Sequence, residues 1–389
     1  MIPLNRPWID QREEEAVVRV MRTGWITQGP EAAQFEDEFA SAVGAAHACA
    51  VSSCTAALHL ALRAAGVSEG DQVLTPSYSF IATANAIRYC GAIPVFVDIA
   101  PGSCNVDPEK LEDSITPLTR AILCVHQMGM PCDLPALAGI AHRRGLPLIE
   151  DAACAAGSKI LYDGEWQPIG RPIGKVACFS FHPRKVITTG EGGMLTTESC
   201  DYDAQFRLLR QHQMSIPDAV RHGLPRVVFE SYAGLGYNYR MTDIAAAVGR
   251  VQLTRLEEIV ALRRVLADRY RTLLDGVTGV RVPVEPEWAR SNWQSFWVRL
   301  APGIDQQRVM QRMLDRGIAT RRGIMCAHLE PAFARSTFVA GAGGLRESEA
   351  AQRQCVLLPL FPSLTEPEQN QVVEALKDAL GAEARRIAS

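Results

Sequence analysis

The sequence has 389 residues, of which 47% are hydrophobic and 21% are charged, and its formal net charge is −3. This composition is ordinary for a globular enzyme of two domains, and the small charge gives no reason to expect nucleic acid or an anionic membrane as a partner. The N-terminal segment lacks the apolar core of a signal peptide and no apolar run is long enough for a membrane span, so we expect a cytoplasmic protein.

Eleven cysteines are scattered along the sequence without a C-x-x-C pair or clustered histidines. Several fall inside apolar segments, as Cys49, Cys124 and Cys178 do, where a free thiol packs as a small hydrophobe. This pattern favours neither a disulfide framework nor a zinc site, so we expect free thiols, a reducing compartment and no metal.

Short apolar runs alternate with helical patterns through the first half of the sequence. Strands are predicted at residues 47–52, 72–75, 93–98, 120–126, 146–150, 177–181 and 193–196. Helices are predicted between several of them, at residues 55–65, 81–89, 108–115 and 134–143. The alternation predicts an α/β fold with a mixed but mostly parallel sheet flanked by helices, whose ligand binds beyond the carboxyl ends of the strands.

A long helical pattern at residues 243–274 leads out of this predicted sheet, and Asp275 with Gly276 marks a boundary. The remaining structured segments are expected at residues 280–282, 293–300, 305–316 and 367–380. Their mixture of strands and helices predicts a small α+β domain. We therefore expect a large domain over residues 1–275, with an N-terminal arm, and a small C-terminal domain over residues 276–389.

Only five lysines stand against 35 arginines, although either residue serves where a surface needs only positive charge. Lys110, Lys159, Lys175 and Lys377 occupy segments that predict exposed side chains. Lys185 instead follows an apolar strand and precedes a glycine turn. Because an arginine cannot form an imine, Lys185 is the candidate for an imine with pyridoxal phosphate (PLP). Burial there would lower the pKa of its amine and favour the neutral nucleophile.

A carboxyl that suits the pyridine nitrogen of PLP follows another predicted strand. Asp151 stands just past a buried run, where a carboxylate can pair with the ring N–H and keep the ring cationic. An aspartate at a strand end is equally common as a turn residue, but the presence of Lys185 favours the functional interpretation. The neighbouring Glu150 points to the opposite side of the strand and is expected to be structural.

Hydroxyl and aromatic residues that follow other predicted strands are candidates to bind the phosphate of the cofactor and to stack against its ring. Ser53 and Thr55 open a helix directly after a strand, where free backbone N–H groups suit a phosphate, although a serine N-cap alone is common. Ser180 could add a further hydroxyl. The ring platform is Phe80 or Tyr78, and either aromatic could equally belong to the core.

Together these segments resemble the DegT/StrS family of sugar aminotransferases, which are fold-type I PLP enzymes. The resemblance covers nearly the whole chain and rests on the order and spacing of several blocks. These blocks are residues 25–30, 51–62, 76–87, 91–98, 125–131, 149–156, 179–196 and 236–241.

The resemblance implies Lys185 as the imine lysine, Asp151 as the partner of the pyridine nitrogen and Phe80 as the stacking ring. The phosphate ligands that it implies are Cys54, Thr55 and Ser180, beside the Ser53 hydroxyl already noted. It also implies that Asn238 reaches the phosphate bound by a neighbouring subunit, so that the protein is a homodimer with active sites at the subunit interface.

The sequence departs from the family pattern at two cysteines. Many members have glycine at the position of Cys54, where a phosphate contact through the backbone N–H would tolerate the change. Many members have glutamine or histidine at the position of Cys154. A thiol is a poor substitute for an amide that donates a hydrogen bond to the 3′-oxygen of PLP.

The family's chemistry implies that an amino acid, L-glutamate, gives its amino group to PLP, and that the product amine then reacts with a keto-sugar attached to a nucleoside diphosphate. The freed amine of Lys185 would move the proton between carbon atoms in each half-reaction. Residues expected to contact the substrates are Thr27, His182, Arg240, Met325 and His328.

Other functions remain open at this point. A keto-cyclitol could replace the sugar as acceptor, since members of the same family use either. A PLP lyase or aldolase has no supporting motif, and an inactive regulator would not need both Lys185 and Asp151. A Rossmann dehydrogenase lacks the required G-x-G-x-x-G.

Overall fold

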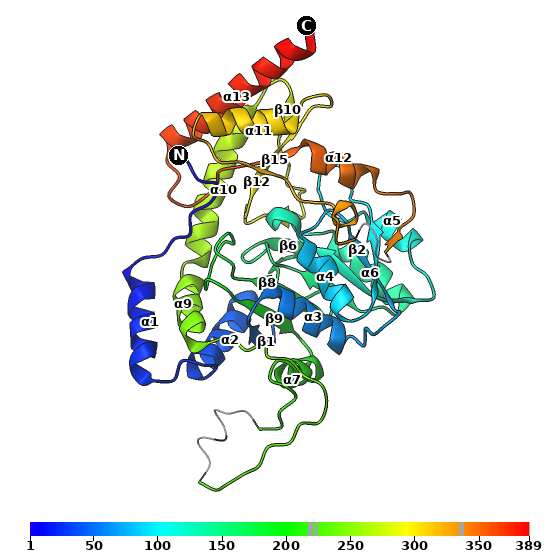
Figure 1. Ribbon diagram of the computed structural model, residues 1–389, viewed down its shortest axis with the longest axis vertical. Coiled ribbons are helices and arrows are strands. Elements are labelled where there is room, and N and C mark those ends of the chain that lie inside the picture. The colour runs from blue at the N-terminus through cyan, green and yellow to red at the C-terminus, as the bar shows by residue number, and fades with distance from the viewer. Residues whose placement is uncertain (217–220, 222–224, 334–337, 389) are drawn as a thin grey trace.

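The computed structural model describes residues 1–216, 221, 225–333 and 338–388. Its largest element is an eight-stranded sheet of order β1-β9-β8-β5-β4-β2-β3-β14 (Figure 1). The strands are β1 (His47–Val51), β2 (Gln72–Pro76), β3 (Ile93–Val97), β4 (Thr119–Val125), β5 (Leu148–Asp151), β8 (Val176–Ser180), β9 (Gly193–Thr197) and β14 (Val339–Ala340). All neighbours from β8 to β14 pair in parallel, whereas β9 runs antiparallel to β1 and β8. The predicted α/β class with a mixed, mostly parallel sheet is confirmed.

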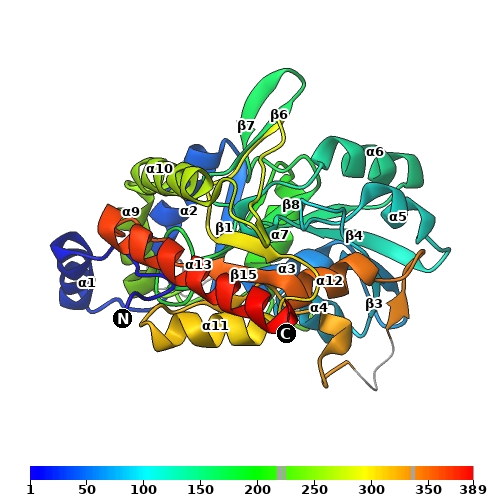
Figure 2. The same cartoon turned by 90° about the horizontal axis from the view of Figure 1, so that it is seen from above.

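Successive residues of the central strands enter two different cores, because side chains alternate between the faces of a sheet. Ile122 belongs to the cluster on one face and Leu123 to the cluster on the other. The helices of the first face are α2 (Pro30–Val43) and α6 (Leu134–Arg144), and those of the second are α3 (Cys54–Ala64), α4 (Ile81–Tyr89) and α7 (Cys200–Leu209). Figure 2 shows α6 and α4 on opposite sides of the strands. The sheet is therefore buried on both faces, as near-continuous apolar strands require.

Further helices in the described part of the chain are α1 (Gln11–Thr23), α5 (Pro108–Asp113), α9 (Asp243–Leu253) and α10 (Leu256–Leu274). The prediction of a single helix over residues 243–274 is thus wrong, because the helix is interrupted between α9 and α10. At the break Arg255 has a fully buried side chain, whose guanidinium donates hydrogen bonds to Asp10 and Glu13 at the start of α1. A buried guanidinium needs such partners, and the tight turn presents it to them.

A smaller antiparallel sheet has the order β10-β12-β15-β13. Its strands are β10 (Val280–Arg281), β12 (Phe296–Leu300), β13 (Arg321–Arg322) and β15 (Cys355–Leu358), and helices α10, α11 (Gln306–Asp315) and α13 (Glu366–Ala388) pack on it. A third sheet joins β11 (Ala289–Arg290) to the hairpin of β6 (Lys159–Tyr162) and β7 (Glu165–Pro168), which the sequence did not predict. The short elements η1 (Gln127–Gly129), η2 (Ala327–Leu329) and α12 (Arg346–Gln354) complete the described structure.

Asp98, just after β3, ties the large sheet to α12. Its buried carboxylate accepts hydrogen bonds from the backbone N–H groups of Glu347 and Ser348 and from the Ser348 hydroxyl. Lys110 Nζ lies 3.0 Å from the same carboxylate. The expectation that Lys110 is a free surface residue is therefore wrong, because a buried carboxylate requires a nearby counter-charge.

None of the helices in the described ranges combines the length and apolarity that a bilayer crossing requires.

Candidate active site

A cavity of about 370 Å³ opens where several strands of the large sheet end. Strands β2, β4, β5 and β8 run in parallel and β1 shares their direction, so their carboxyl ends meet along one edge of the sheet. The cavity is lined by these predicted site residues: Ser53, Cys54, Thr55, Phe80, Asp151, Cys154, Ser180, His182, Lys185 and Met325. The sheet thus brings together residues that are distant in the sequence, at the place where open α/β sheets bind ligands.

Four other predicted contacts lie outside the cavity lining: Thr27, Asn238, Arg240 and His328. Asn238 and Arg240 pair through their backbones with Gln211 and Val51. His328 has its Nδ1 2.6 Å from Ser77 Oγ and its Nε2 3.4 Å from Glu349, so its ring joins a buried loop to α12. Within the described part of one chain, these residues do not border the site, and for His328 a structural role accounts for the ring.

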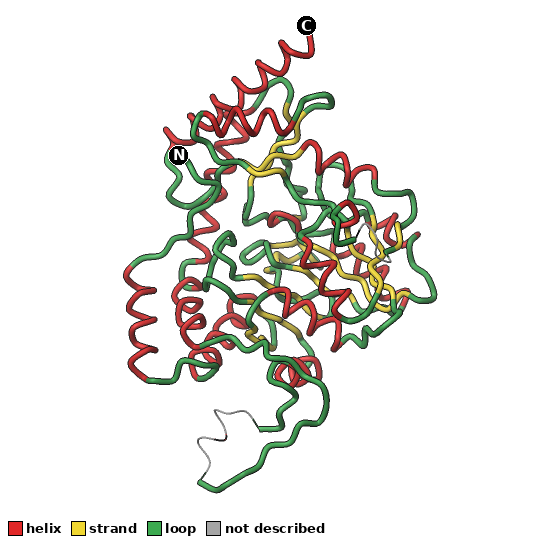
Figure 3. The backbone as a smooth tube through the Cα atoms, in the orientation of Figure 1, coloured by secondary structure: helices red, strands yellow, loops and turns green. Residues whose placement is uncertain are grey.

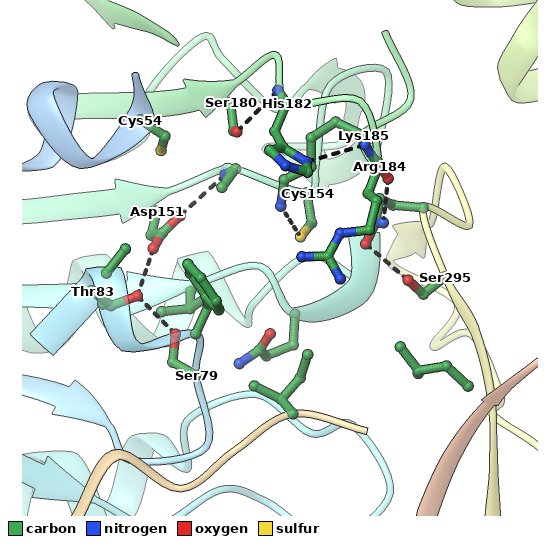
Figure 4. Close-up of a pocket in the computed structure, with 18 of the residues that line it drawn as sticks. Cys54, Ser79, Thr83, Asp151, Cys154, Ser180, His182, Arg184, Lys185 and Ser295 are labelled. Atoms are coloured by element: carbon green, nitrogen blue, oxygen red, sulfur yellow. Dashed lines mark hydrogen bonds between the residues drawn. The ribbon is translucent and has the colours of Figure 1, made fainter. Parts of the chain in front are cut away.

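Asp151 is the last residue of β5, and its buried carboxylate is held from two sides. Oδ2 accepts a hydrogen bond of 2.8 Å from Thr83 Oγ1, and Oδ1 accepts one of 3.1 Å from the Ala153 backbone N–H. Thr83 Oγ1 is in turn 2.7 Å from Ser79 Oγ (Figure 4). Burial raises the pKa of Asp151 above its usual value, although these hydrogen bonds and Lys185 oppose the change. A cation placed beside Asp151 would therefore be stabilised strongly.

Lys185 follows β8, and its amine points into the cavity beside Cys154. Lys185 Nζ lies 3.1 Å from Cys154 Sγ (Figure 4). Burial alone would lower the pKa of Lys185, but Cys154, Cys54 and Asp151 outweigh burial and raise it. The prediction of a lowered pKa is therefore wrong for the chain without cofactor, because the sequence pattern did not reveal how many acidic groups surround the amine.

The first turn of α3 faces the cavity with backbone N–H groups. Ser53 caps the helix by accepting a hydrogen bond of 3.1 Å from the Ala56 N–H. The N–H groups of the first helical residues, Cys54 and Thr55, have no intrahelical acceptor. The Cys54 thiol is turned away and donates to the Cys178 carbonyl. Behind this turn, a Cβ on Gly193 would lie only 2.5 Å from the Ser53 carbonyl carbon, so a glycine is required there.

The two candidates for a ring platform differ in exposure. Tyr78 is fully buried, and its hydroxyl accepts a hydrogen bond of 3.0 Å from the Ile324 N–H. Phe80 is 51% exposed and lines the cavity. Only Phe80 can therefore contact a bound ring. Its exposure also shows that this phenyl group is not part of the core.

Glu150 lies on the far side of the strand from Asp151. Its side chain is fully buried, accepts a hydrogen bond from the Gly174 N–H and lies 3.3 Å from His126 Nε2. The structure thus gives Glu150 the supporting position that alternation along the strand predicted.

Several residues that line the cavity were not predicted from the sequence: Asn5, Ser79, Thr83, Gln127, Arg184, Glu191, Gln294 and Arg321. Thr83 could have been found, because it lies one helical turn after Phe80 and faces the same way. Arg184 directly precedes Lys185, and this position next to the candidate imine lysine could have signalled it. Asn5, Gln294 and Arg321 reach the site only through tertiary packing, so nothing in their local sequence signals it.

Comparison with known proteins places this geometry in a family. A model of the DegT/DnrJ/EryC1/StrS aminotransferase family matches residues 7–377. The spore coat polysaccharide biosynthesis protein SpsC of Bacillus subtilis (strain 168) is 34% identical over 386 residues, which cover 97% of this chain and 96% of that protein. The aminotransferase TlmJ from Streptoalloteichus hindustanus superposes with a TM-score of 0.89 at 32% identity, covering 98% of this chain and 99% of that one. Spr1654 from Streptococcus pneumoniae, described as a sugar aminotransferase, superposes in its PLP form with a TM-score of 0.89 at 27% identity, covering 98% of this chain and 99% of that one.

Proposed function

Because the chain belongs to the DegT/DnrJ/EryC1/StrS aminotransferase family, we propose that it transfers an amino group from L-glutamate to the keto group of a nucleotide-linked sugar. Membership makes it an aminotransferase that depends on PLP. The proposal for its substrates is supported by relatives described as a polysaccharide biosynthesis protein and a sugar aminotransferase. The observation that carries it is the meeting of Lys185, Asp151 and the first turn of α3 in one cavity.

The residues of the cavity fit PLP. Asp151 is a buried carboxyl whose raised pKa calls for a cationic partner, and a protonated pyridine nitrogen is one. The N–H groups of Cys54 and Thr55, with the hydroxyls of Ser53 and Ser180, would hold the phosphate. The Cys54 thiol is engaged elsewhere, which supports a backbone contact at this position.

When bound, PLP supplies an aldehyde that exchanges amino groups and a ring that accepts electron density. Lys185 Nζ is the amine that would hold the aldehyde, and the same amine would take the proton from the Cα of the donor. Asp151 would keep a proton on the ring nitrogen, and Thr83 Oγ1 fixes the orientation of this carboxylate by donating a hydrogen bond to it. Phe80 supplies a face against which a flat ring can stack.

The proposed assembly is a homodimer. Residues 225–235, which come after α7 in the sequence, extend beyond the large sheet (Figure 3). Val227, Phe229 and Leu235 are each more than 80% exposed there. Monomeric proteins seldom expose several large apolar groups in one segment, which favours contact with a second copy. Asn238 and Arg240, which miss the cavity of their own chain, follow this segment.

The first test is the visible absorbance of the purified protein with PLP, before and after addition of L-glutamate. A band at roughly 410–430 nm that bleaches to roughly 330 nm would report transfer of the amino group to the cofactor. Lys185→Ala should abolish this conversion, whereas Lys175→Ala, which changes an exposed lysine, should retain it.

The second half of the reaction is tested by adding keto-sugar nucleotides to the bleached enzyme. Return of the visible band with a sugar nucleotide supports the proposed acceptor, and return only with a keto-cyclitol would replace it. A protein that binds no PLP would refute the aminotransferase proposal itself.

A further inference from the structure

Two arginines line the cavity without a protein counter-charge. Arg184 directly precedes Lys185, and Arg321 begins β13 of the smaller sheet. In the described ranges neither guanidinium forms an ion pair with a carboxylate. The adjacent Arg322, by contrast, lies outside the cavity and has its guanidinium 3.0 Å from Glu330. An arginine that faces a cavity and lacks a partner is available for an anionic ligand.

The loop that carries Arg184 is fixed on both sides. The Arg184 N–H donates to His182 Nδ1 at 3.2 Å, and its carbonyl accepts from Gln294 Nε2 at 2.9 Å. Asn5 Nδ2 donates to the Pro183 carbonyl at 3.0 Å. Figure 4 shows Arg184 beside Lys185 and Cys154 on the wall of the cavity. The backbone that bears both Arg184 and the amine is thus held in place before any ligand arrives.

The acidic groups of the cavity leave these arginines free. Asp151 is occupied by Thr83 and the Ala153 N–H at the base of the site. Glu191 lies near His182, whose pKa is lowered by burial and by nearby Arg184 against the effect of Glu191. Neither carboxyl forms an ion pair with Arg184 or Arg321 within the described ranges, so both guanidinium groups remain available to an anionic substrate.

Bond connectivity decides which anionic group each arginine can reach. The α-carboxylate of an amino acid is attached to the carbon that bears the reacting nitrogen, so it must lie close to Lys185 Nζ, on the cavity wall to which Arg184 also belongs. A second carboxylate on the donor side chain lies several bonds away and needs a cation from another wall. Arg321 comes from such a wall, in the other sheet. The diphosphate of a sugar nucleotide is separated from the keto carbon by the sugar ring and so lies farther from Lys185.

We propose that Arg184 binds the α-carboxylate of the amino donor and that Arg321 binds the carboxylate of its side chain. This inference rests on the proposed aminotransferase function and makes the chain selective for a dicarboxylic donor. Both contacts are charge-assisted hydrogen bonds, for which arginine offers a bidentate geometry.

The test titrates two probes into the PLP-loaded protein by calorimetry: glutarate, a dicarboxylate without an amine, and inorganic pyrophosphate. Arg184→Gln and Arg321→Gln should each weaken glutarate binding by about tenfold or more, the loss expected for one hydrogen bond to a charged group. Pyrophosphate binding should be unchanged in both. Arg322→Gln is the matched control and should bind glutarate as the wild type does. Arg184→Lys keeps the charge and should recover part of the affinity if folding is intact.

Donor kinetics separate the two arginines. Arg321→Gln should raise the half-saturating concentration of L-glutamate but not that of L-alanine, whereas Arg184→Gln should raise both. The limiting rate of the absorbance change should fall less than the affinity, since the arginines bind rather than react.

Other outcomes overturn the inference. Loss of pyrophosphate binding in place of glutarate binding would assign the arginines to the diphosphate. Glutarate affinity unchanged in both variants, or no glutarate binding by the wild type, would show that no such carboxylate site exists. The titrations need no turnover, so a protein that binds glutarate but never converts L-glutamate would refute the proposed function and leave the subsite standing.

Discussion

At the scale of single residues, the buried carboxylate of Asp151 destabilises the cofactor-free fold but is suited to bind a cationic ring nitrogen. Its carboxylate is buried at the end of β5, and burial raises its pKa. A carboxyl whose pKa is higher in the folded than in the unfolded state destabilises the fold as the pH rises above the unfolded value of 3.8. Ionisation of Asp151 in the cofactor-free protein therefore carries a penalty, which a cationic ring nitrogen would relieve.

We accordingly predict opposite effects of Asp151→Asn on stability and on cofactor binding. The cofactor-free variant should melt at a higher temperature than the cofactor-free wild type at pH 7, and the difference should shrink as the pH falls through the pKa of Asp151. Its affinity for PLP should fall by about 10- to 100-fold, because a hydrogen bond to a charged group is lost. Thermal melts across the pH range and PLP titrations measure the two effects.

Asp37→Asn is the control, since Asp37 is exposed on α2 and remote from the cavity lining. It should change neither quantity. Equal melting temperatures for the cofactor-free wild type and Asp151→Asn at pH 7 would show that the carboxylate carries no penalty.

Cys154 illustrates how one substitution alters the electrostatics around the amine. Its sulfur is the nearest polar atom that the structure places on Lys185 Nζ, at 3.1 Å. It is the foremost of the groups that raise the pKa of Lys185 against burial. An amide at this position could donate a hydrogen bond but cannot ionise. The thiol therefore favours the protonated amine in the free chain.

At the scale of elements, Asp98 acts as a cap for a helix distant in sequence. Helix α12 has no capping side chain of its own at Leu345, and Asp98 supplies the acceptor for its first N–H groups. Burial would raise the pKa of Asp98, but its hydrogen bonds to Ser348, Lys110 and Glu347 lower it below the usual value. Its contribution to stability is thus present above the unfolded value of 3.8 and is lost as the pH falls through the folded pKa.

We predict that Asp98→Ala costs about 2–4 kcal/mol in the free energy of unfolding, because it leaves buried donors without an acceptor and Lys110 without its partner. Urea denaturation at pH 7 measures the change. Asp113→Ala, at the exposed end of α5, should cost less than about 0.5 kcal/mol. A cost for Asp98→Ala no larger than that of the control would mean that α12 does not depend on this cap.

The elements and residues that the sequence predicted share a local signal. The strand ending in Asp151 and the strand before Lys185 are apolar runs bounded by polar turns, and the structure places both within a residue or two of the predicted ends. The hairpin of β6 and β7 was missed because its side chains are half-exposed and mixed in character. Its conformation depends on pairing with β11, more than 120 residues away. Arg321 was missed for the same reason, since its place in the cavity lining exists only after the two sheets pack.

At the scale of the whole molecule, the homodimer proposed above rests on the exposed apolar residues of segment 225–235. We predict that the purified protein has twice the mass of one chain by light scattering at micromolar concentration. Phe229→Asp should shift it towards the monomer, because a charge on an apolar contact must lose its hydration. Val284→Asp, a matched change at another exposed apolar residue, should leave the mass unchanged. A wild type that elutes as a monomer would contradict the dimer.

The edge strand β14 is the last strand of the large sheet to be synthesised. Val339 and Ala340 pair in parallel with Val95 and Phe96, so the large sheet receives its outermost strand from a part of the chain that is synthesised long after the other seven. During synthesis, β3 is therefore an unpaired edge strand until more than 200 further residues have left the ribosome. An unpaired edge strand can form hydrogen bonds with strands of other chains. A fragment that stops at residue 275 would keep every residue of the strand ends around Lys185 and Asp151 and still lack this cover. Such a fragment would therefore fail by aggregating with other chains through the edge of β3 during synthesis, although it retains the catalytic groups.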